Sequence, residues 1–193
     1  MAYQREVFED SMLVAFAGLR ASGKDKAGEH LAQKGFMHIA LGDLVRIEAH
    51  NLGLSNDRYV LIDLANRMRR ESGEAVFCLK AFERFSAEKE NWPAGLALTG
   101  VRAVAEAMAV KSAPGRLIFV EALDAVRHAR VKSRSRGDES FGSIEEFLEN
   151  EKKEYIGGTN NVPAVKPLAD VVLANNGSLD EFYARIDEEL GLR

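Results

Sequence analysis

Two glycines and a lysine near the amino-terminal end carry the clearest chemical signal of this 193-residue sequence. Residues 18–24 read GLRASGK, so Gly18, Gly23 and Lys24 fit the spacing G-x-x-x-x-G-K. Glycines let backbone N–H groups turn inward around a phosphate chain, and a lysine adds positive charge for its outer oxygens. A glycine-rich turn with a purely structural role can have the same spacing. The pattern therefore predicts a phosphate-binding loop, with a structural turn as the alternative.

The segments on either side of this loop favour phosphate binding. An apolar run over residues 12–18 predicts a strand that leads into the loop, and residues 23–34 have the spacing of a helix that follows it. A helix N-terminus carries positive potential, which favours an anion at that position. The residues expected at the phosphates of ATP are Gly18, Arg20, Ala21, Ser22, Gly23, Lys24, Asp25 and Lys26.

Asp25 departs from the usual form of this motif, in which Ser or Thr follows the lysine and holds Mg²⁺ through its hydroxyl. A carboxylate can hold Mg²⁺ directly or through water. The same residue also suits the first turn of a helix, where an acid is favourable. The sequence leaves both roles open for Asp25, and it makes Ser22 a second candidate for a phosphate contact.

Apolar runs and helical patterns alternate along the rest of the chain, which predicts an α/β fold with a mainly parallel sheet. The expected strands cover residues 12–18, 36–40, 95–100, 116–123 and 169–176, with helices between them. Residues 54–90 have the spacing of at least two helices without a strand, which is more than one crossover needs. We therefore expect an inserted helical lobe between the second and third strands. A loop is expected over residues 157–167.

Three further segments resemble a known group of enzymes. HIALGDLVR (38–46) and GLALTGVR (95–102) are similar to acceptor-binding segments of adenylate-kinase-like nucleoside monophosphate kinases. ADVVLANNGSLDEF (169–182) resembles the C-terminal strand and loop of dephospho-CoA kinases, and still more a group of poorly characterised archaeal and bacterial kinase-like proteins. The resemblance implies one P-loop NTPase domain over residues 1–193, a three-layer α/β/α sandwich with a five-stranded parallel sheet of order 2-3-1-4-5. It also implies a helical acceptor lobe at about residues 44–92 and a short lid at about residues 131–145.

The resemblance also assigns roles to individual residues, with ATP and Mg²⁺ as cofactors. The implied catalytic residues are Lys24, Arg102, Arg134 and Arg136, and the implied acceptor-binding residues are Asp43, Arg46, Arg69 and Arg102. Arg127 and Arg130 would begin the arm to the lid that carries Arg134 and Arg136, and Asn175 would lie near the adenine. Such converging cations fit phosphoryl transfer, which depends on positioning and charge neutralisation. A solvated basic helix face is the alternative reading of the run over residues 127–136.

Thr99 marks a departure from those kinases, whose third strand usually ends in an aspartate that orders the water around Mg²⁺. Asp25 and Glu121 are the candidates to replace that acid, Glu121 because it ends the fourth expected strand. Glu121 also suits an ordinary surface position at a strand end. The substitution leaves open a protein that binds nucleotide but has lost the chemistry.

Composition and charge exclude several classes of protein. With 26 basic and 30 acidic residues the net charge is −4, which argues against a general coat on nucleic acid. The single cysteine, Cys78, excludes an internal disulfide and a cysteine-rich zinc site, and we expect it to be buried. No apolar run reaches membrane-spanning length, and the polar start MAYQREVFEDS is unlike a secretory signal. We therefore expect a cytoplasmic protein that binds neither nucleic acid nor membrane.

Together these features predict a nucleotide kinase, an ATP-dependent phosphotransferase that acts on a nucleotide-like acceptor. Arg46 and Arg102 favour an acceptor that carries a phosphate, and a (deoxy)nucleoside monophosphate is the first choice. Two alternatives stay open: a dephospho-CoA kinase-like activity, and a catalytically degenerate nucleotide-binding regulatory protein. The sequence leaves the oligomeric state open between monomer and homodimer.

Overall fold

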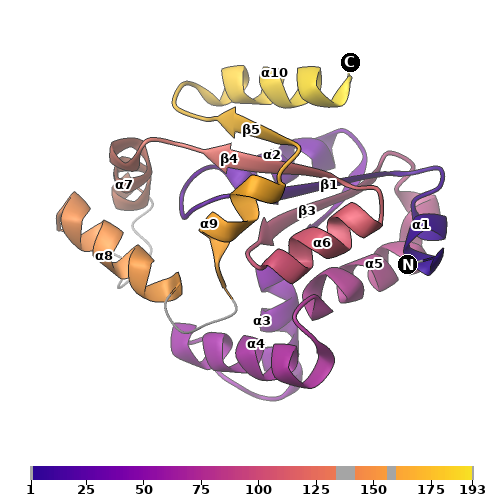
Figure 1. Cartoon of the computed structure of the whole chain (residues 1–193), viewed down its shortest axis with the longest axis horizontal. Coiled ribbons are helices and arrows are strands. Elements are labelled where there is room, and N and C mark those ends of the chain that lie inside the picture. Colours follow the sequence, from indigo (N-terminus) through magenta and orange to yellow (C-terminus); the bar gives the residue numbers. More distant parts are fainter. Residues whose placement is uncertain (1, 134–141, 156–159, 193) are drawn as a thin grey trace.

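A parallel sheet of five strands forms the centre of the structure (Figure 1). The computed structural model describes residues 2–133, 142–155 and 160–192. The strands are β1 (Met12–Ala17), β2 (Phe36–Ala40), β3 (Gly95–Val101), β4 (Arg116–Glu121) and β5 (Val171–Ala174). Their order is β2-β3-β1-β4-β5, and each neighbouring pair is parallel. The predicted fold class and strand order are therefore confirmed.

The central strands are apolar along nearly their whole length, because both faces of the sheet are covered. β1 and β3 are almost completely buried, as expected for inner strands of a parallel sheet. Their side chains alternate between the two faces. In β1, Val14 and Phe16 belong to one core cluster, whereas Leu13 and Ala15 belong to the other. The outer strand β5 has no fully buried residue.

Helices form the layers on both faces of the sheet. α2 (Lys24–Gln33) and α10 (Leu179–Leu190) pack against the face of Val14 and Phe16. The larger core on the other face includes residues of α1 (Ala2–Val7), α3 (Leu41–Asn51), α4 (Arg58–Ser72), α5 (Val76–Glu88), α6 (Val104–Ser112) and α9 (Val162–Val165). Cys78 is fully buried in this core, as expected. Among the described residues, no helix combines the length and apolar character that a membrane span requires.

Two groups of helices lie between consecutive strands. α3, α4 and α5, with the short 3-10 turn η1 (Lys89–Asn91), connect β2 to β3 and correspond to the expected inserted helices. α7 (Asp124–Ser133) and α8 (Ile144–Tyr155) pack against each other beyond the carboxyl end of β4 (Figure 1). α3 begins at the carboxyl end of β2, and α7 follows the carboxyl end of β4. Open α/β sheets bind their ligands at that edge.

The predicted loop over residues 157–167 is wrong in its second half, where the structure has α9 and the 3-10 turn η2 (Lys166–Leu168). Asn161 begins α9 because its side chain accepts a hydrogen bond from Ala164 N at 3.3 Å, and Pro163 suits the first turn. The amino-terminal helix α1 has no counterpart among the predicted elements. The bounds of β2 match the prediction, β1, β3 and β4 differ from it by one or two residues at one end, and β5 is two residues shorter at each end.

Gly95 provides a test of how tightly the central strands approach each other. It has a φ of +124°, and a Cβ there would lie 1.9 Å from the carbonyl oxygen of Met12. Gly95→Ala must therefore displace a central strand, and we expect it to lower the free energy of unfolding by about 3 kcal/mol or more. Denaturant unfolding measures this loss.

Gly53→Ala is the matched control for Gly95→Ala. Gly53 has a φ of +67°, but no described atom lies within 4 Å of an added Cβ. The control therefore carries only the backbone strain of a left-handed alanine, about 1 kcal/mol. Equal losses in the two variants would contradict the close approach of β3 and β1.

Candidate functional site

The loop between β1 and α2 has a shape that depends on its two glycines. Gly18 has a φ of +150°, and a Cβ there would lie 2.4 Å from the carbonyl oxygen of Val120. Gly23 has a φ of +109°, and a Cβ there would lie 2.1 Å from Asn175 Nδ2. Ala21, between them, has a φ of +59°, in the left-handed region that alanine rarely adopts. Both glycines of the motif are thus needed for backbone conformation and for close packing.

Two arginines of α7 hold carbonyl groups of this loop from behind. Arg127 Nη1 donates to the carbonyl oxygen of Arg20 at 3.1 Å. Arg130 Nη1 donates to the carbonyl oxygens of Ala21 and Ser22 at 3.4 and 3.3 Å. In a trans peptide the N–H group points away from the carbonyl of the same unit. The three anchored carbonyls therefore turn the N–H groups of the following residues toward the other side of the loop, and that of Ser22 closes a turn with Leu19 O at 3.2 Å.

Asn175 connects the end of β5 to the same loop. It is buried, its Nδ2 donates to the Ser22 carbonyl at 2.8 Å, and its Oδ1 accepts from Arg130 Nη2 at 3.2 Å. The missing side chain of Gly23 leaves the space that the Asn175 amide occupies. Asn175 is expected near an adenine, and in the structure its amide anchors a carbonyl of the loop.

The loop and the start of α2 carry groups that suit an anion. Ser22 Oγ is fully buried and makes no hydrogen bond to any described residue. The first N–H groups of α2 have no acceptor within the helix, because every helix leaves its first turn of donors unsatisfied. Lys24 occupies the first position of α2 and is 9% exposed. Hydroxyl, amide and ammonium donors at one helix N-terminus fit a phosphate chain.

The two acids expected near a metal ion lie in different settings. Asp25 is exposed in the first turn of α2, next to the loop. Glu121 lies at the carboxyl end of β4 and forms an ion pair with Lys166. Within the described ranges, no three His, Cys, Asp or Glu side chains are grouped so that they could hold a metal ion. Asp25 is exposed beside the loop, so its carboxylate could serve as one ligand of Mg²⁺ together with oxygens of a bound ligand and water.

Thr99 lies fully buried near the end of β3, and its hydroxyl is paired with a histidine. His38 Nε2 on the neighbouring strand β2 lies 3.0 Å from Thr99 Oγ1. Gly28 of α2 makes room for the ring, since a Cβ there would lie 2.2 Å from the same nitrogen. Burial lowers the pKa of His38, although the Asp25 carboxylate and other acids oppose the shift. The end of β3 thus carries a neutral hydrogen-bonded pair and no acid at position 99.

The expected acceptor-binding residues lie on α3, on α4 and directly after β3. Asp43 and Arg46 are exposed on α3 and form an ion pair with each other. Arg102 is exposed at the end of β3. Arg69 of α4 is buried instead, and its Nη2 donates to Glu106 Oε1 at 3.2 Å. The structure thus leaves three of these four side chains accessible and encloses the fourth.

Glu106 connects two of these arginines, and the sequence analysis did not single it out. Its Oε2 accepts from the backbone N–H groups of Arg102 and Ala103 at 2.7 and 3.1 Å, while its Oε1 binds Arg69. The Arg69 guanidinium also lies 4.8 Å from the centre of the Phe77 ring. Glu106 stands three residues after Ala103, the N-cap of α6. An alanine there lacks the hydroxyl that marks a capping box, so the local sequence carries no signal for this role.

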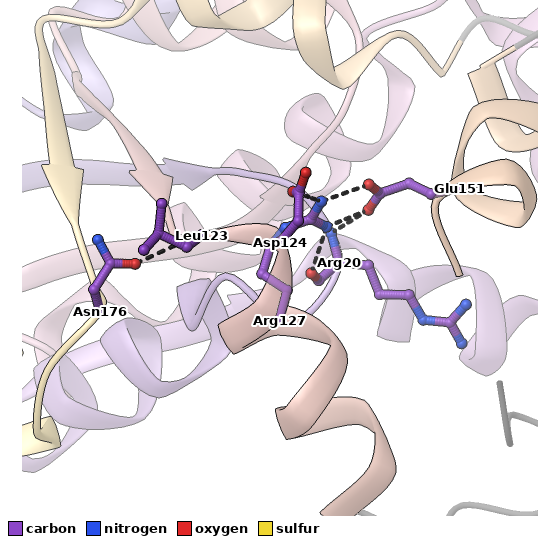
Figure 2. A network of polar contacts seen from close by, with 6 residues as sticks. All are labelled: Arg20, Leu123, Asp124, Arg127, Glu151 and Asn176. Carbon is purple, nitrogen blue, oxygen red and sulfur yellow. Dashed lines mark hydrogen bonds and ion pairs between the residues drawn. The ribbon is translucent and has the colours of Figure 1, made fainter. Parts of the chain in front are cut away.

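Arg127 is buried at the centre of a polar network rather than exposed on an arm (Figure 2). Its Nη1 and Nη2 donate to the two carboxylate oxygens of Glu151 at 2.6 and 2.9 Å, and Nη2 also donates to Asp124 at 2.7 Å. Burial lowers the pKa of Arg127, but the hydrogen bonds to Glu151 and Asp124 outweigh it and leave the pKa raised. Arg134, Arg136 and most of the expected lid lie outside the described residues.

An open hollow of about 480 Å³ lies beside the loop, between α7 and the turn after β5. Arg130 belongs both to this hollow and to the anchors of the loop. The residues around it are Ala125, Val126, Ala129, Arg130, Ser133, Asn176 and Gly177. Asn176 Oδ1 accepts a hydrogen bond from Leu123 N at 2.8 Å, which connects the turn after β5 to the segment just before α7 (Figure 2).

Solved structures with the same arrangement define the class of fold. TT1252 from Thermus thermophilus matches with a TM-score of 0.62 and 21% identity, over 94% of this chain and 97% of that one. Shikimate kinase from Acinetobacter baumannii matches with a TM-score of 0.54 and 15% identity, over 97% of both chains. Shikimate kinase from Bacteroides thetaiotaomicron matches with a TM-score of 0.56 and 15% identity, over 94% of this chain and 99% of that one. The molecule therefore has a P-loop kinase fold.

Sequence relatives identify the family. The UPF0200 protein of Methanoregula boonei is 33% identical over 181 residues, which cover 91% of this chain and 94% of the relative. The UPF0200 protein of Thermococcus kodakarensis is 31% identical over 179 residues, with 91% and 94% covered. No family model matches the sequence. The chain belongs to the UPF0200 family.

The buried pair of His38 and Thr99 predicts a pH dependence of stability. Burial places the pKa of folded His38 below the ~6.5 of a solvated histidine, so the unfolded chain binds more protons at mildly acidic pH. The contribution of His38 is complete above about pH 6.5 and is lost progressively as the pH falls through the folded-state pKa. His38→Asn should remove this part of the dependence, measured by urea unfolding at several pH values. An NMR titration that gives His38 a pKa at or above ~6.5 would contradict the assignment.

Proposed function

We propose that the protein is an ATP-dependent phosphotransferase. The observation that carries this proposal is the loop over residues 18–24, whose carbonyl groups are anchored by Arg127, Arg130 and Asn175. The anchors leave N–H groups, the buried Ser22 hydroxyl and the start of α2 for a ligand on the inner side. A polyphosphate has the charge and the acceptor oxygens that such a cradle requires.

The hollow beside the loop supports a nucleotide as the source of that polyphosphate. Its apolar wall comes from Ala125, Val126 and Ala129 of α7, and its opposite side comes from Asn176 and Gly177. An aromatic base bound in this hollow would pack a face against the alanine-rich helix and form hydrogen bonds from its edge to the polar turn. The turn that follows Asn175 then serves as the adenine side of the site.

Arg46 and Arg102 support an acceptor that itself carries a phosphate. They follow parallel strands β2 and β3, whose carboxyl ends meet at one edge of the sheet. Each exposed guanidinium can form charge-assisted hydrogen bonds to phosphate oxygens. Asp43 would orient Arg46, and Arg69 would act through Glu106, which holds the backbone at Arg102. A (deoxy)nucleoside monophosphate is the acceptor class that we propose.

In the proposed reaction the protein positions two phosphorylated molecules and neutralises their charge. The loop amides and Lys24 would hold the β- and γ-phosphates of ATP, and Arg46 and Arg102 would hold the acceptor phosphate. Mg²⁺ supplies additional neutralisation of the phosphates when bound, and Asp25 is the side chain that would hold it. Arg134 and Arg136 remain proposed partners of the transferring phosphoryl group.

Thr99 favours a second candidate, a nucleotide-binding regulatory protein without efficient catalysis. Neither Thr99 nor neutral His38 can replace the charge of an acid at the end of β3. A dephospho-CoA kinase-like activity is the third candidate, and the resemblance of residues 169–182 supports it. The three candidates share the nucleotide site and differ in what happens at the acceptor.

Lys24→Ala tests the nucleotide site. Loss of the ammonium removes a charge-assisted contact to the phosphates, so we expect ATP to bind about 10- to 100-fold more weakly. Lys80→Ala is the matched control, because Lys80 is exposed on α5 and lies outside the proposed site. Isothermal titration calorimetry measures both affinities. Unchanged ATP affinity in Lys24→Ala would overturn the assignment of the loop.

Turnover with a panel of acceptors separates the three candidates. ATP and Mg²⁺ are supplied with each nucleoside monophosphate, each deoxynucleoside monophosphate and dephospho-CoA, and ADP formation is measured. We expect acceptor-dependent ADP formation with at least one monophosphate, and its loss in Arg102→Ala. Turnover with dephospho-CoA alone would establish that activity instead. ATP binding without turnover on any acceptor would favour the regulatory protein.

A further inference from the structure

Glu151 ties helix α8 to the phosphate-binding loop across a long stretch of chain. Its Oε1 accepts a hydrogen bond from the backbone N–H of Arg20 at 3.1 Å, and the two residues are 131 positions apart. Arg127 stands between them on α7 and binds both. Figure 2 shows that it is the backbone of Arg20, not its guanidinium, that enters this network.

The three residues form a closed ring of hydrogen bonds. The Arg20 N–H donates to Glu151, Arg127 donates to the same carboxylate oxygen, and Arg127 also donates to the Arg20 carbonyl. Both polar groups of one loop residue are thus held by one buried ion pair. The Arg127 and Glu151 side chains are 1% and 6% exposed, so the bonds form where water does not compete.

Apolar contacts support the same part of the loop. Ala21 packs in a small core with Val131 of α7 and Phe147 of α8, apart from the two larger cores. Phe147 also lies under Arg127, with the guanidinium carbon 5.2 Å from the ring centre. Ala21 has the strained left-handed backbone conformation of this loop, and side chains of α7 and α8 pack against it. The charged side chains of Arg127 and Glu151 hold the backbone of the preceding residue, Arg20.

We propose that Glu151 is a positioning residue that sets the conformation of the phosphate-binding loop. The inference rests on the proposed function, because the loop matters for binding only if it holds phosphates. Glu151 fixes the peptide planes on both sides of Arg20, directly and through Arg127. These planes precede the left-handed turn at Ala21 and so determine where the next N–H groups point. Without the carboxylate, the Arg20 N–H loses its acceptor. Arg127 then keeps Asp124 but loses its bidentate partner, so it holds the Arg20 carbonyl less firmly.

Glu151→Gln tests the proposal in the full-length protein. Glu149→Gln is the matched control, since Glu149 is exposed on the same helix and the change removes the same charge. Inorganic pyrophosphate and ADP are titrated by calorimetry, and the amide resonances of Ala21, Ser22 and Gly23 are recorded by NMR without ligand. We expect Glu151→Gln to shift these resonances and to weaken pyrophosphate binding at least about tenfold. Glu149→Gln should change neither.

A second variant guards against a general loss of stability. Glu151→Gln removes the bidentate, buried counterion of Arg127 and leaves the half-exposed Asp124 as its charged partner. Arg127→Met combined with Glu151→Met instead removes both buried charges and retains apolar volume. We expect this double variant to fold and still to bind pyrophosphate more weakly, because both partners of the Arg20 backbone are gone. Wild-type affinity and unchanged loop resonances in either folded variant of Glu151 would overturn the positioning role.

Failure of the proposed function has a different signature. If the wild-type protein binds neither pyrophosphate nor ADP, the phosphotransferase proposal fails. The amide resonances of the ligand-free protein then still test whether Glu151 determines the conformation of the loop. If the loop amide resonances then shift in Glu151→Gln but not in Glu149→Gln, Glu151 still determines the conformation of the loop. Unshifted resonances would overturn that role as well.

Discussion

The site depends on one physical constraint, which is the orientation of the peptide units between Arg20 and Gly23. The N–H and the C=O of one peptide unit point in opposite directions. When the N–H faces an anion, the carbonyl therefore faces the protein interior, where it needs a hydrogen-bond donor. Arg127, Arg130 and Asn175 supply those donors from α7 and from the end of β5. The rest of the fold brings these two elements against a loop more than a hundred residues earlier in the chain.

The parallel sheet explains how such distant segments meet. All five strands end at the same edge, so the loop after β1, the start of α7 after β4 and Asn175 after β5 are neighbours in space (Figure 1). Close packing then makes the arrangement specific, since Gly18 lies against the backbone at Val120 and Gly23 against Asn175. The glycines of the motif thus serve two purposes: they permit the loop conformation, and they let the anchors approach.

The sheet could be predicted from the sequence, but only part of the candidate site could. Continuous apolar runs and the G-x-x-x-x-G-K spacing are local signals, and they predicted the strands and the loop at residues 18–24. The roles of Glu106, Glu151 and Asn175 depend on contacts between remote segments, which no local pattern encodes. α9 was missed because a proline-containing polar segment resembles a loop until its cap at Asn161 is seen. Similarly, only the structure shows that Arg69 and Arg127 are buried beside acids.

The central claim is that the inner side of this loop grips a polyphosphate, and a crystal structure with a non-hydrolysable ATP analogue and Mg²⁺ tests it most directly. The account predicts phosphate oxygens within hydrogen-bond distance of Ser22 Oγ, Lys24 Nζ and the loop amides, with the carbonyls of Arg20 and Ser22 still held by Arg127 and Asn175. An analogue bound elsewhere on the molecule, or loop carbonyls turned toward the phosphates, would contradict it.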